Sequence, residues 1–141
     1  MPDGVFHQFD LRVYYEDTDS GGIVYYANYL RFTERARTEM LRDAGIDHGT
    51  LLERDGLAFA VRHCHVEYLT PACLDDALQV ISTLEHVGGA SMEMKQIVMR
   101  DEQALCVMDV RLACMQVVGD RAGRPKRIPD DVRNAVLQFA A

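Results

Sequence analysis

The chain has 141 residues, of which 48% are hydrophobic and 26% charged, with a formal net charge of −7. This length favours one domain over residues 1–141, and the negative charge argues against broad nucleic-acid binding. No apolar run approaches the ~20 residues of a membrane helix, the first ten residues (MPDGVFHQFD) lack the features of a secretory signal, and the four cysteines have no CxxC spacing. We therefore expect a cytoplasmic protein with no membrane span and with buried, reduced thiols.

The first predicted element is a strand that ends at Tyr15. Apolar and polar side chains alternate from Phe9 to Tyr15, as they do in a half-buried strand. Residues 16–25 then contain three carboxylates and the Gly21-Gly22 pair. Because glycine permits tight turns and the close approach of another molecule, this stretch is expected to be an acidic turn.

A long helix is predicted next, from about Tyr26 to Ala44, with Gly45 as its stop. Apolar residues recur at helical spacing over this range. The start of a helix offers unpaired N–H groups and a partial positive charge. A carboxylate beside such a donor-rich helix end suits hydrolysis of an acyl group. The carboxylate can activate water or attack the carbonyl carbon, while the N–H donors stabilise the oxyanion.

The rest of the chain predicts four strands and a short helix. Asp47 is a candidate cap for a short turn before them. The strands are expected at residues 57–69, 77–87, 91–99 and 103–118, with turns at residues 88–89 and 101–102. Pro129 suits the first position of the last helix.

The strand at residues 57–69 has apolar side chains on both faces. Strict alternation places Leu57, Phe59 and Val61 on one face and Cys64 and Tyr68 on the other. We therefore expect this strand to be covered on both sides.

Five strands in this order are expected to form one antiparallel sheet, with the amphipathic helix across its concave face, in an α+β fold. One helix covers one face of the sheet only. The other face, with apolar residues such as Val107 and Met115, is left for a partner subunit, so we expect a dimer or a higher oligomer.

The acidic turn and the residues after it resemble the 4-hydroxybenzoyl-CoA thioesterase family, and most closely its branch of Tol-Pal-associated acyl-CoA thioesterases. The matching segments are YEDTDSGGIVYYANY (15–29), LRF (30–32), ERAR (34–37), EYLTPA (67–72) and PKRIP (125–129). The resemblance implies a hotdog fold, in which a curved five-stranded antiparallel sheet wraps a long central helix. It also implies hydrolysis of acyl-CoA thioesters without metal or cofactor, at sites between the subunits of a homodimer or homotetramer.

The resemblance also assigns site residues. The catalytic carboxylate falls on Asp19, as general base on water or as nucleophile, and the donor to the thioester carbonyl is the backbone N–H of Tyr26. The candidate substrate-binding residues are Tyr15, Gly22, Arg62, Ser91, Arg124, Lys126 and Arg127.

Two departures from the family pattern affect the substrate. The Tol-Pal-associated branch usually carries His at the position of Tyr26, where 4-hydroxybenzoyl-CoA enzymes carry Tyr, so the acyl preference stays open. Some members bind CoA phosphates with a basic cluster between the third and fourth strands, but residues 87–91 carry no positive charge. Phosphate contacts are then expected from the tail at residues 124–127 or from Arg62.

Plainer interpretations stand beside these assignments. Asp19 could be a turn residue, Tyr15 could pack in the core, and the tail could be a solvated segment. The three clustered carboxylates could bind Mg²⁺ or Ca²⁺, although no second cluster of ligands is evident. His63 and His65 share one face of a strand, as zinc ligands can, but no third ligand is in view.

The sequence therefore predicts an acyl-CoA thioesterase, with acyl carrier protein thioesters as a second substrate class. Two other functions remain open. One is a binding or scaffold protein for acyl-CoA or acyl carrier protein. The other is a hotdog dehydratase, although that chemistry usually needs a His paired with a carboxylate, and the acidic turn contains no His.

Overall fold

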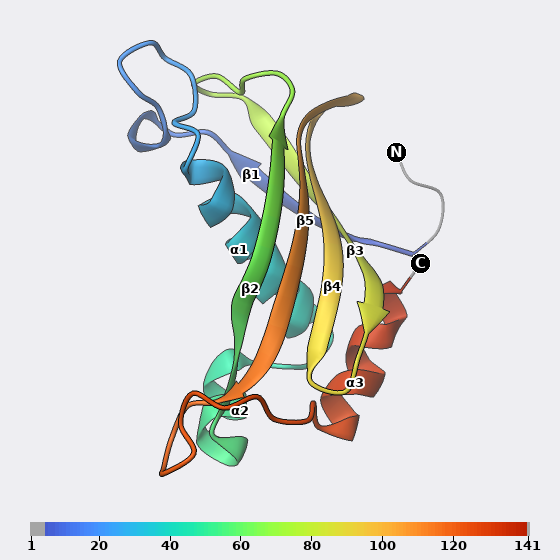
Figure 1. Ribbon diagram of the computed structural model, residues 1–141. Coiled ribbons are helices and arrows are strands. Elements are labelled where there is room, and N and C mark those ends of the chain that lie inside the picture. The colour runs from blue at the N-terminus through green and yellow to red at the C-terminus, as the bar shows by residue number, and fades with distance from the viewer. Residues whose placement is uncertain (1–4, 141) are drawn as a thin grey trace.

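A curved antiparallel sheet lies across the long helix α1 (Asn28–Asp43) in the computed structural model, which describes residues 5–140 (Figure 1). The first four residues, part of the stretch in which no signal is recognised, lie outside the described residues. The strands are β1 (His7–Arg12), β2 (Leu57–Tyr68), β3 (Ala77–Val87), β4 (Ser91–Arg100) and β5 (Gln103–Gln116). The remaining helices are α2 (His48–Asp55), α3 (Asp130–Val136) and the 3₁₀ turns η1 (Tyr15–Asp17) and η2 (Leu137–Phe139).

The sheet has the order β1-β3-β4-β5-β2, with every neighbouring pair antiparallel. Its inner face packs against α1, whose buried side chains, among them Phe32 and Met40, meet buried residues such as Val98 and Leu112. This burial of one helical stripe against one sheet face stabilises the fold. The predicted α+β hotdog architecture is confirmed, and β1 and β2 are left as the two edges.

Several predicted elements begin or end at other residues than expected, and the strand predicted at residues 103–118 already ends at Gln116. The first strand stops at Arg12, because the Asp17 carboxylate accepts the Tyr14 N–H at 2.8 Å and draws residues 15–17 into a 3₁₀ turn. Helix α1 begins at Asn28 rather than near Tyr26. Pro129 precedes the first residue of α3 instead of occupying it.

A β-bulge in β2 overturns the predicted division of its faces. The pairing with β5 shifts between Val61 and His63, so Arg62 is the extra residue. An extra residue reverses the alternation. Phe59 therefore packs against the core from the same inner side as Tyr68, whose ring lies 5.5 Å from that of Tyr29 on α1.

β2 is also less covered than predicted. Residues 60–65 are exposed within the single chain, and Val61 is 50% exposed. Val107 and Met115, on β5, are half-buried. A 12-residue strand with one unpaired edge and exposed apolar side chains is a ready template for pairing with another chain.

The thiols divide into two groups. The expectation of buried thiols holds for Cys106 and Cys114 and is wrong for Cys64 and Cys73, which are exposed. Burial raises the pKa of the Cys106 thiol to about 11, which makes it a poor nucleophile at neutral pH. None of the helices within residues 5–140 is long and apolar enough to cross a membrane.

Candidate active site

The acidic turn holds Asp19 in an exposed position with one carboxylate oxygen engaged. Its Oδ1 accepts the Gly21 N–H at 2.8 Å, and its own N–H donates to Ile23 O at 3.0 Å. Gly22 has a φ of 78°, a left-handed conformation that favours glycine. The second carboxylate oxygen accepts no hydrogen bond within the described chain and faces solvent, where a water or a substrate carbonyl carbon can reach it.

The loop at residues 72–76 holds this turn in place through backbone hydrogen bonds. Val24 N–H donates to Ala72 O at 2.8 Å, and Leu74 N–H donates to Gly22 O at 3.1 Å. That loop is closed in turn by Asp76, whose carboxylate accepts the Cys73 N–H at 2.8 Å and pairs with Arg100 at 2.6 Å. Burial alone would raise the pKa of Asp76, but the Cys73 N–H and the Arg100 guanidinium outweigh it and hold the pKa below its usual range.

Asp76→Asn is expected to lower the free energy of unfolding by about 1–2 kcal/mol at neutral pH, since it removes a charge-assisted bond to a partly buried Arg100. A depressed Asp pKa gives stability that is present above the unfolded pKa and is lost as pH falls through the folded pKa. The gap between variant and wild type in urea titrations should therefore close in acid. Asp75→Asn, at an exposed neighbour whose side chain makes no hydrogen bond or ion pair within the described chain, is the matched control. An equal effect of both substitutions would contradict the assignment.

Tyr26 lies in the turn between the acidic segment and α1. Its backbone oxygen accepts the Tyr68 hydroxyl at 3.2 Å, and the next turn closes through Asn28 N–H donating to Tyr25 O at 2.8 Å. Within the described chain, the Tyr26 N–H has no hydrogen-bond acceptor. Its side chain is 61% exposed, with the ring centre 4.9 Å from that of Tyr25. The segment from the acidic turn to α1 therefore presents an unpaired N–H donor at Tyr26 as well as one unpaired carboxylate oxygen at Asp19.

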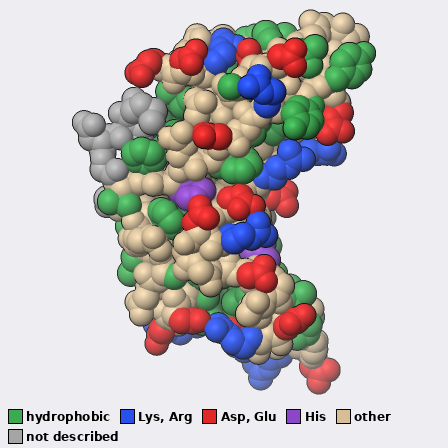
Figure 2. All heavy atoms as spheres, turned by 180° about the vertical axis from the view of Figure 1, so that it is seen from behind, with side chains coloured by type: hydrophobic (Ala, Val, Ile, Leu, Met, Phe, Trp, Pro, Cys, Tyr) green, Lys and Arg blue, Asp and Glu red, His purple; other side chains and the backbone are tan. Residues whose placement is uncertain are grey.

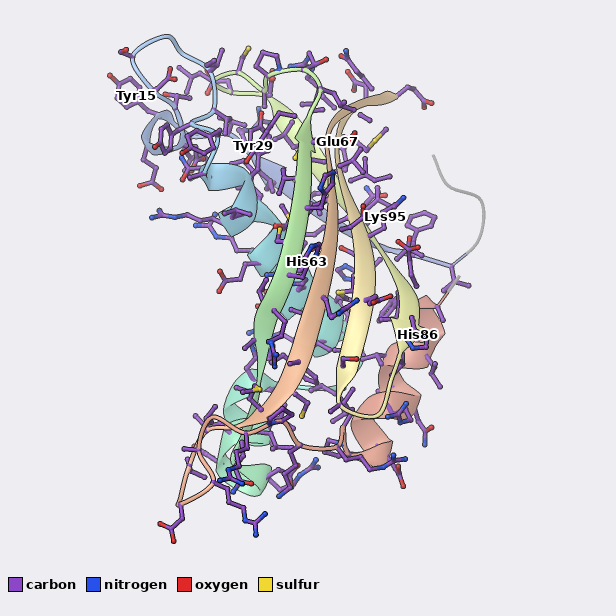
Figure 3. The ribbon with its side chains drawn as sticks, viewed as in Figure 1. Tyr15, Tyr29, His63, Glu67, His86 and Lys95 are labelled. Carbon is purple, nitrogen blue, oxygen red and sulfur yellow. The ribbon has the colours of Figure 1, made fainter. Side chains whose placement is uncertain are left out.

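The sequence-predicted residues Tyr15 and Gly22 lie at the same end of the molecule. Tyr15 is 82% exposed, so core packing is wrong for it, and Figure 3 shows it on the outer part of the turn, away from the sheet. Tyr29, by contrast, lies at the start of α1 beside β2, where its hydroxyl accepts the Ala72 N–H at 3.0 Å (Figure 3).

The basic candidates lie at the opposite end of the sheet. Arg124 and Lys126 line a surface cavity with Arg121, a cation that the sequence argument missed. The segment is anchored to β5, because Lys126 N–H donates to Cys114 O at 2.8 Å. Arg127 is exposed, with a guanidinium nitrogen 4.0 Å from the Asp130 carboxylate.

Ser91 lies at this same end, beside the turn at Gly88-Gly89. That turn carries no charge of its own, yet Arg133 of α3 donates to Gly88 O at 2.7 Å. Arg62, at the bulge of β2, lies between the two ends and is exposed.

One chain does not bring the acidic turn and the basic tail together. Tyr68, the last residue of β2, donates a hydrogen bond to Tyr26 O. At the other end of β2, Gly56 O accepts the N–H of Val117, the residue at which the chain leaves β5 toward the tail. The 12 residues of β2 span roughly 40 Å at the usual rise of a strand.

Within residues 5–140, no three His, Cys, Asp or Glu side chains are grouped as metal ligands.

A hotdog sheet with an exposed carboxylate and a free N–H donor on a glycine-rich turn defines the class as hotdog-fold thioesterases. The chain belongs to the thioesterase-like superfamily, whose family model matches residues 13–136, and it is a thioester hydrolase. It is 42% identical over 127 residues to the acyl-CoA thioesterase YbgC of Haemophilus influenzae, covering 90% of this chain and 91% of that protein.

Solved structures agree with this fold. A probable thioesterase of Bartonella henselae matches with a TM-score of 0.80 at 36% identity, covering 88% of this chain and 99% of that one. A 4-hydroxybenzoyl-CoA thioesterase bound to 4-hydroxybenzoyl-CoA matches with a TM-score of 0.85 at 18% identity, covering 94% and 99%. These structures support the fold, and the family model together with the relative from Haemophilus influenzae confirms the predicted membership of this thioesterase family.

Proposed function

We propose that this enzyme is a cytoplasmic acyl-CoA thioesterase of one hotdog domain, in which Asp19 and the Tyr26 N–H act on the thioester. The observation that carries the proposal is an exposed carboxylate followed closely in the chain by an unpaired N–H donor, on a segment that backbone hydrogen bonds tie to the loop at Ala72 and Leu74. The relative from Haemophilus influenzae, named an acyl-CoA thioesterase, supports the substrate class. Acyl carrier protein thioesters and an association with Tol-Pal stay predictions.

The chemistry follows from these two groups. As general base, Asp19 takes a proton from water while the water oxygen attacks the carbonyl carbon. The Tyr26 N–H stabilises the oxyanion that forms, and the C–S bond then breaks as the thiolate leaves and accepts the proton. As nucleophile, Asp19 instead forms an acyl anhydride that water hydrolyses. The bond from Gly21 N–H to Oδ1 orients the carboxylate in both routes.

Two copies joined through β2 complete the site in this proposal. Antiparallel pairing centred on the bulge at Arg62 places Tyr68 of one copy opposite Gly56 of the other, because the two strands run in opposite directions. The catalytic turn of each copy then lies at the end where its partner carries the basic tail. Exposure of residues 60–65 supports β2 as the paired edge.

The partner's tail would then bind the phosphates of CoA. Replacing Arg121, Arg124 and Lys126 by Gln should raise KM several-fold with kcat nearly unchanged, because these contacts persist from the ground state to the transition state. The wild-type KM should also rise with salt, since exposed charges are screened. Initial rates over a range of acyl-CoA and salt concentrations measure both effects.

Arg31→Gln, an exposed cation on α1, is the control for that change. An unchanged KM in the tail variant, together with no salt response in the wild type, would exclude the tail as a CoA site.

Tyr26→Phe keeps the backbone N–H and removes only the hydroxyl. We expect a loss in kcat/KM below about tenfold, or ~1.4 kcal/mol, whereas loss of an oxyanion donor costs ~10²–10³ in kcat. Steady-state rates of the folded variant decide this point. A loss of two or more orders of magnitude would make the phenol itself the catalytic group.

Release of free thiol from a panel of acyl-CoA substrates tests the function as a whole. Turnover of several acyl-CoAs is the expected result. Tight binding without thiol release would favour a scaffold protein, and loss of water from a hydroxyacyl thioester without cleavage would favour a dehydratase.

A further inference from the structure

A cavity of about 300 Å³ opens between α1 and the free edge of the sheet. Leu41, Phe59, Val61 and Leu112 give it an apolar wall, and Arg37 and Glu34 add one charge of each sign. Figure 2 shows the molecule hollowed along one side, between the end that carries the acidic turn and the end that carries α2. The mechanism proposed above uses neither of these two charges.

Arg37 is held in this cavity by a buried amide. Its Nη1 donates to Gln96 Oε1 at 2.9 Å. Gln96, fully buried on β4, donates in turn to Thr33 O and to Ser82 Oγ, each at 3.0 Å. A buried network of this kind orients its members, so Gln96 holds the Arg37 guanidinium on the wall of the cavity.

The charge of Arg37 is only partly compensated. Within residues 5–140, no carboxylate lies within 4.0 Å of its guanidinium, although Glu34 is near enough to favour the charged form. Burial lowers the pKa of the Arg37 guanidinium, which still leaves it protonated at neutral pH. Besides its apolar wall, the cavity is lined by Glu34, Thr38 and His48. A half-buried cation with free N–H donors in such a partly polar cavity is a recognition element for an oxygen atom.

The cavity is suited to the acyl group of a substrate held by the second copy. The cavity lies beside Phe59 and Val61, in the first half of β2. The Tyr26 of the same chain lies at the other end of this strand, where it contacts Tyr68, the last residue of β2. Pairing of two copies through β2 brings the partner's catalytic turn to the Phe59 end. An acyl group entering from that turn passes the apolar wall and meets Arg37.

We propose that Arg37 determines specificity by donating a hydrogen bond to an oxygen carried on the acyl group, so that hydroxylated acyl thioesters are preferred over unsubstituted ones. A hydroxyl is the matching group because it accepts from Arg37 and donates to Glu34 on the same wall. A carboxylate gains from Arg37 but is repelled by Glu34. This inference rests on the proposed function and on the paired arrangement of β2.

Matched substrates test the inference. Kinetics on wild type compare butyryl-CoA with its 3-hydroxy and 4-hydroxy forms, hexanoyl-CoA with its 6-hydroxy form, and glutaryl-CoA as the carboxylate arm. We expect at least one hydroxylated member to exceed its parent by at least about tenfold in kcat/KM, with glutaryl-CoA below it. A wild type that treats every pair alike, or that prefers glutaryl-CoA, overturns the inference.

Two variants then assign the preference to Arg37. Arg37→Met should bring the ratio of hydroxylated to unsubstituted substrate close to one, and this ratio is read independently of any change in the rate on the parent. Arg37→Lys should retain part of the ratio because it keeps a charged donor. Arg35→Met, an exposed arginine on the same helix, should leave the ratio intact. An unchanged ratio in folded Arg37→Met or Arg37→Lys contradicts the assignment. Absence of thiol release from every substrate would instead contradict the proposed function.

Discussion

Asp19→Asn is expected to lower kcat by about 10²–10⁴ while the enzyme stays folded, because a positioned acid or base contributes that much. The amide keeps its oxygen as an acceptor for the Gly21 N–H at 2.8 Å, so the turn should hold its shape. The nucleophilic route predicts a loss at least as large, since an amide cannot form the anhydride. Thiol release under saturating substrate measures the effect.

Asp17→Asn is the matched control for this change. Asp17 lies on the same turn, but its carboxylate accepts the Tyr14 N–H at 2.8 Å, a structural role that an amide oxygen can also fill. Its activity should fall far less than that of Asp19→Asn. More than about a tenth of wild-type turnover in folded Asp19→Asn, against the loss expected of a catalytic acid or base, would remove Asp19 from the mechanism.

The second large effect is expected at the β2 edge. Lysine on an edge strand opposes pairing, so Ala60→Lys combined with His65→Lys should give a monomer. Both positions are exposed and alternate with the residues that face α1. A monomer would lack the partner's cavity and tail, which position the substrate in this proposal. We therefore expect about a 10²-fold loss in kcat/KM, because misplacement of the reacting groups costs about that much.

The other edge of the sheet provides the control for this double variant. Gln8→Lys combined with Asp10→Lys places two lysines at exposed positions of β1. This variant should leave both the mass of the oligomer and its activity unchanged. Light scattering at assay concentrations reports the mass. A wild type that is fully active as a monomer would contradict the proposal that two copies share each site.

The sequence predicted the order and type of the main elements because each carries a clear local signal. Alternation marks β3 and β4, helical spacing marks α1, and the acidic turn was recognised from its residues. The division of β2 into faces was wrong, because a bulge depends on which partner residue each strand residue meets. Periodicity within the strand carries no information on that pairing.

Three features of the candidate site required the fold. Arg37 and Gln96 are 59 residues apart, so no spacing reveals their contact. Arg121 joins the basic tail only because the loop after β5 folds back on the strand. The separation of Asp19 from Lys126 along β2 likewise appears only in the sheet, and this separation is the ground for proposing a second copy.

Mixing two inactive variants tests most directly whether the site is shared between copies. Asp19→Asn removes the carboxylate that we propose to be catalytic, and Thr38→Trp fills the cavity between α1 and β2 from a half-buried position on its wall. Random reassociation makes half of the dimers mixed, each with one intact site, so activity should return to about a quarter of wild type. If each cavity served the catalytic turn of its own chain, the mixture would stay as inactive as its two components, and that result would contradict the account.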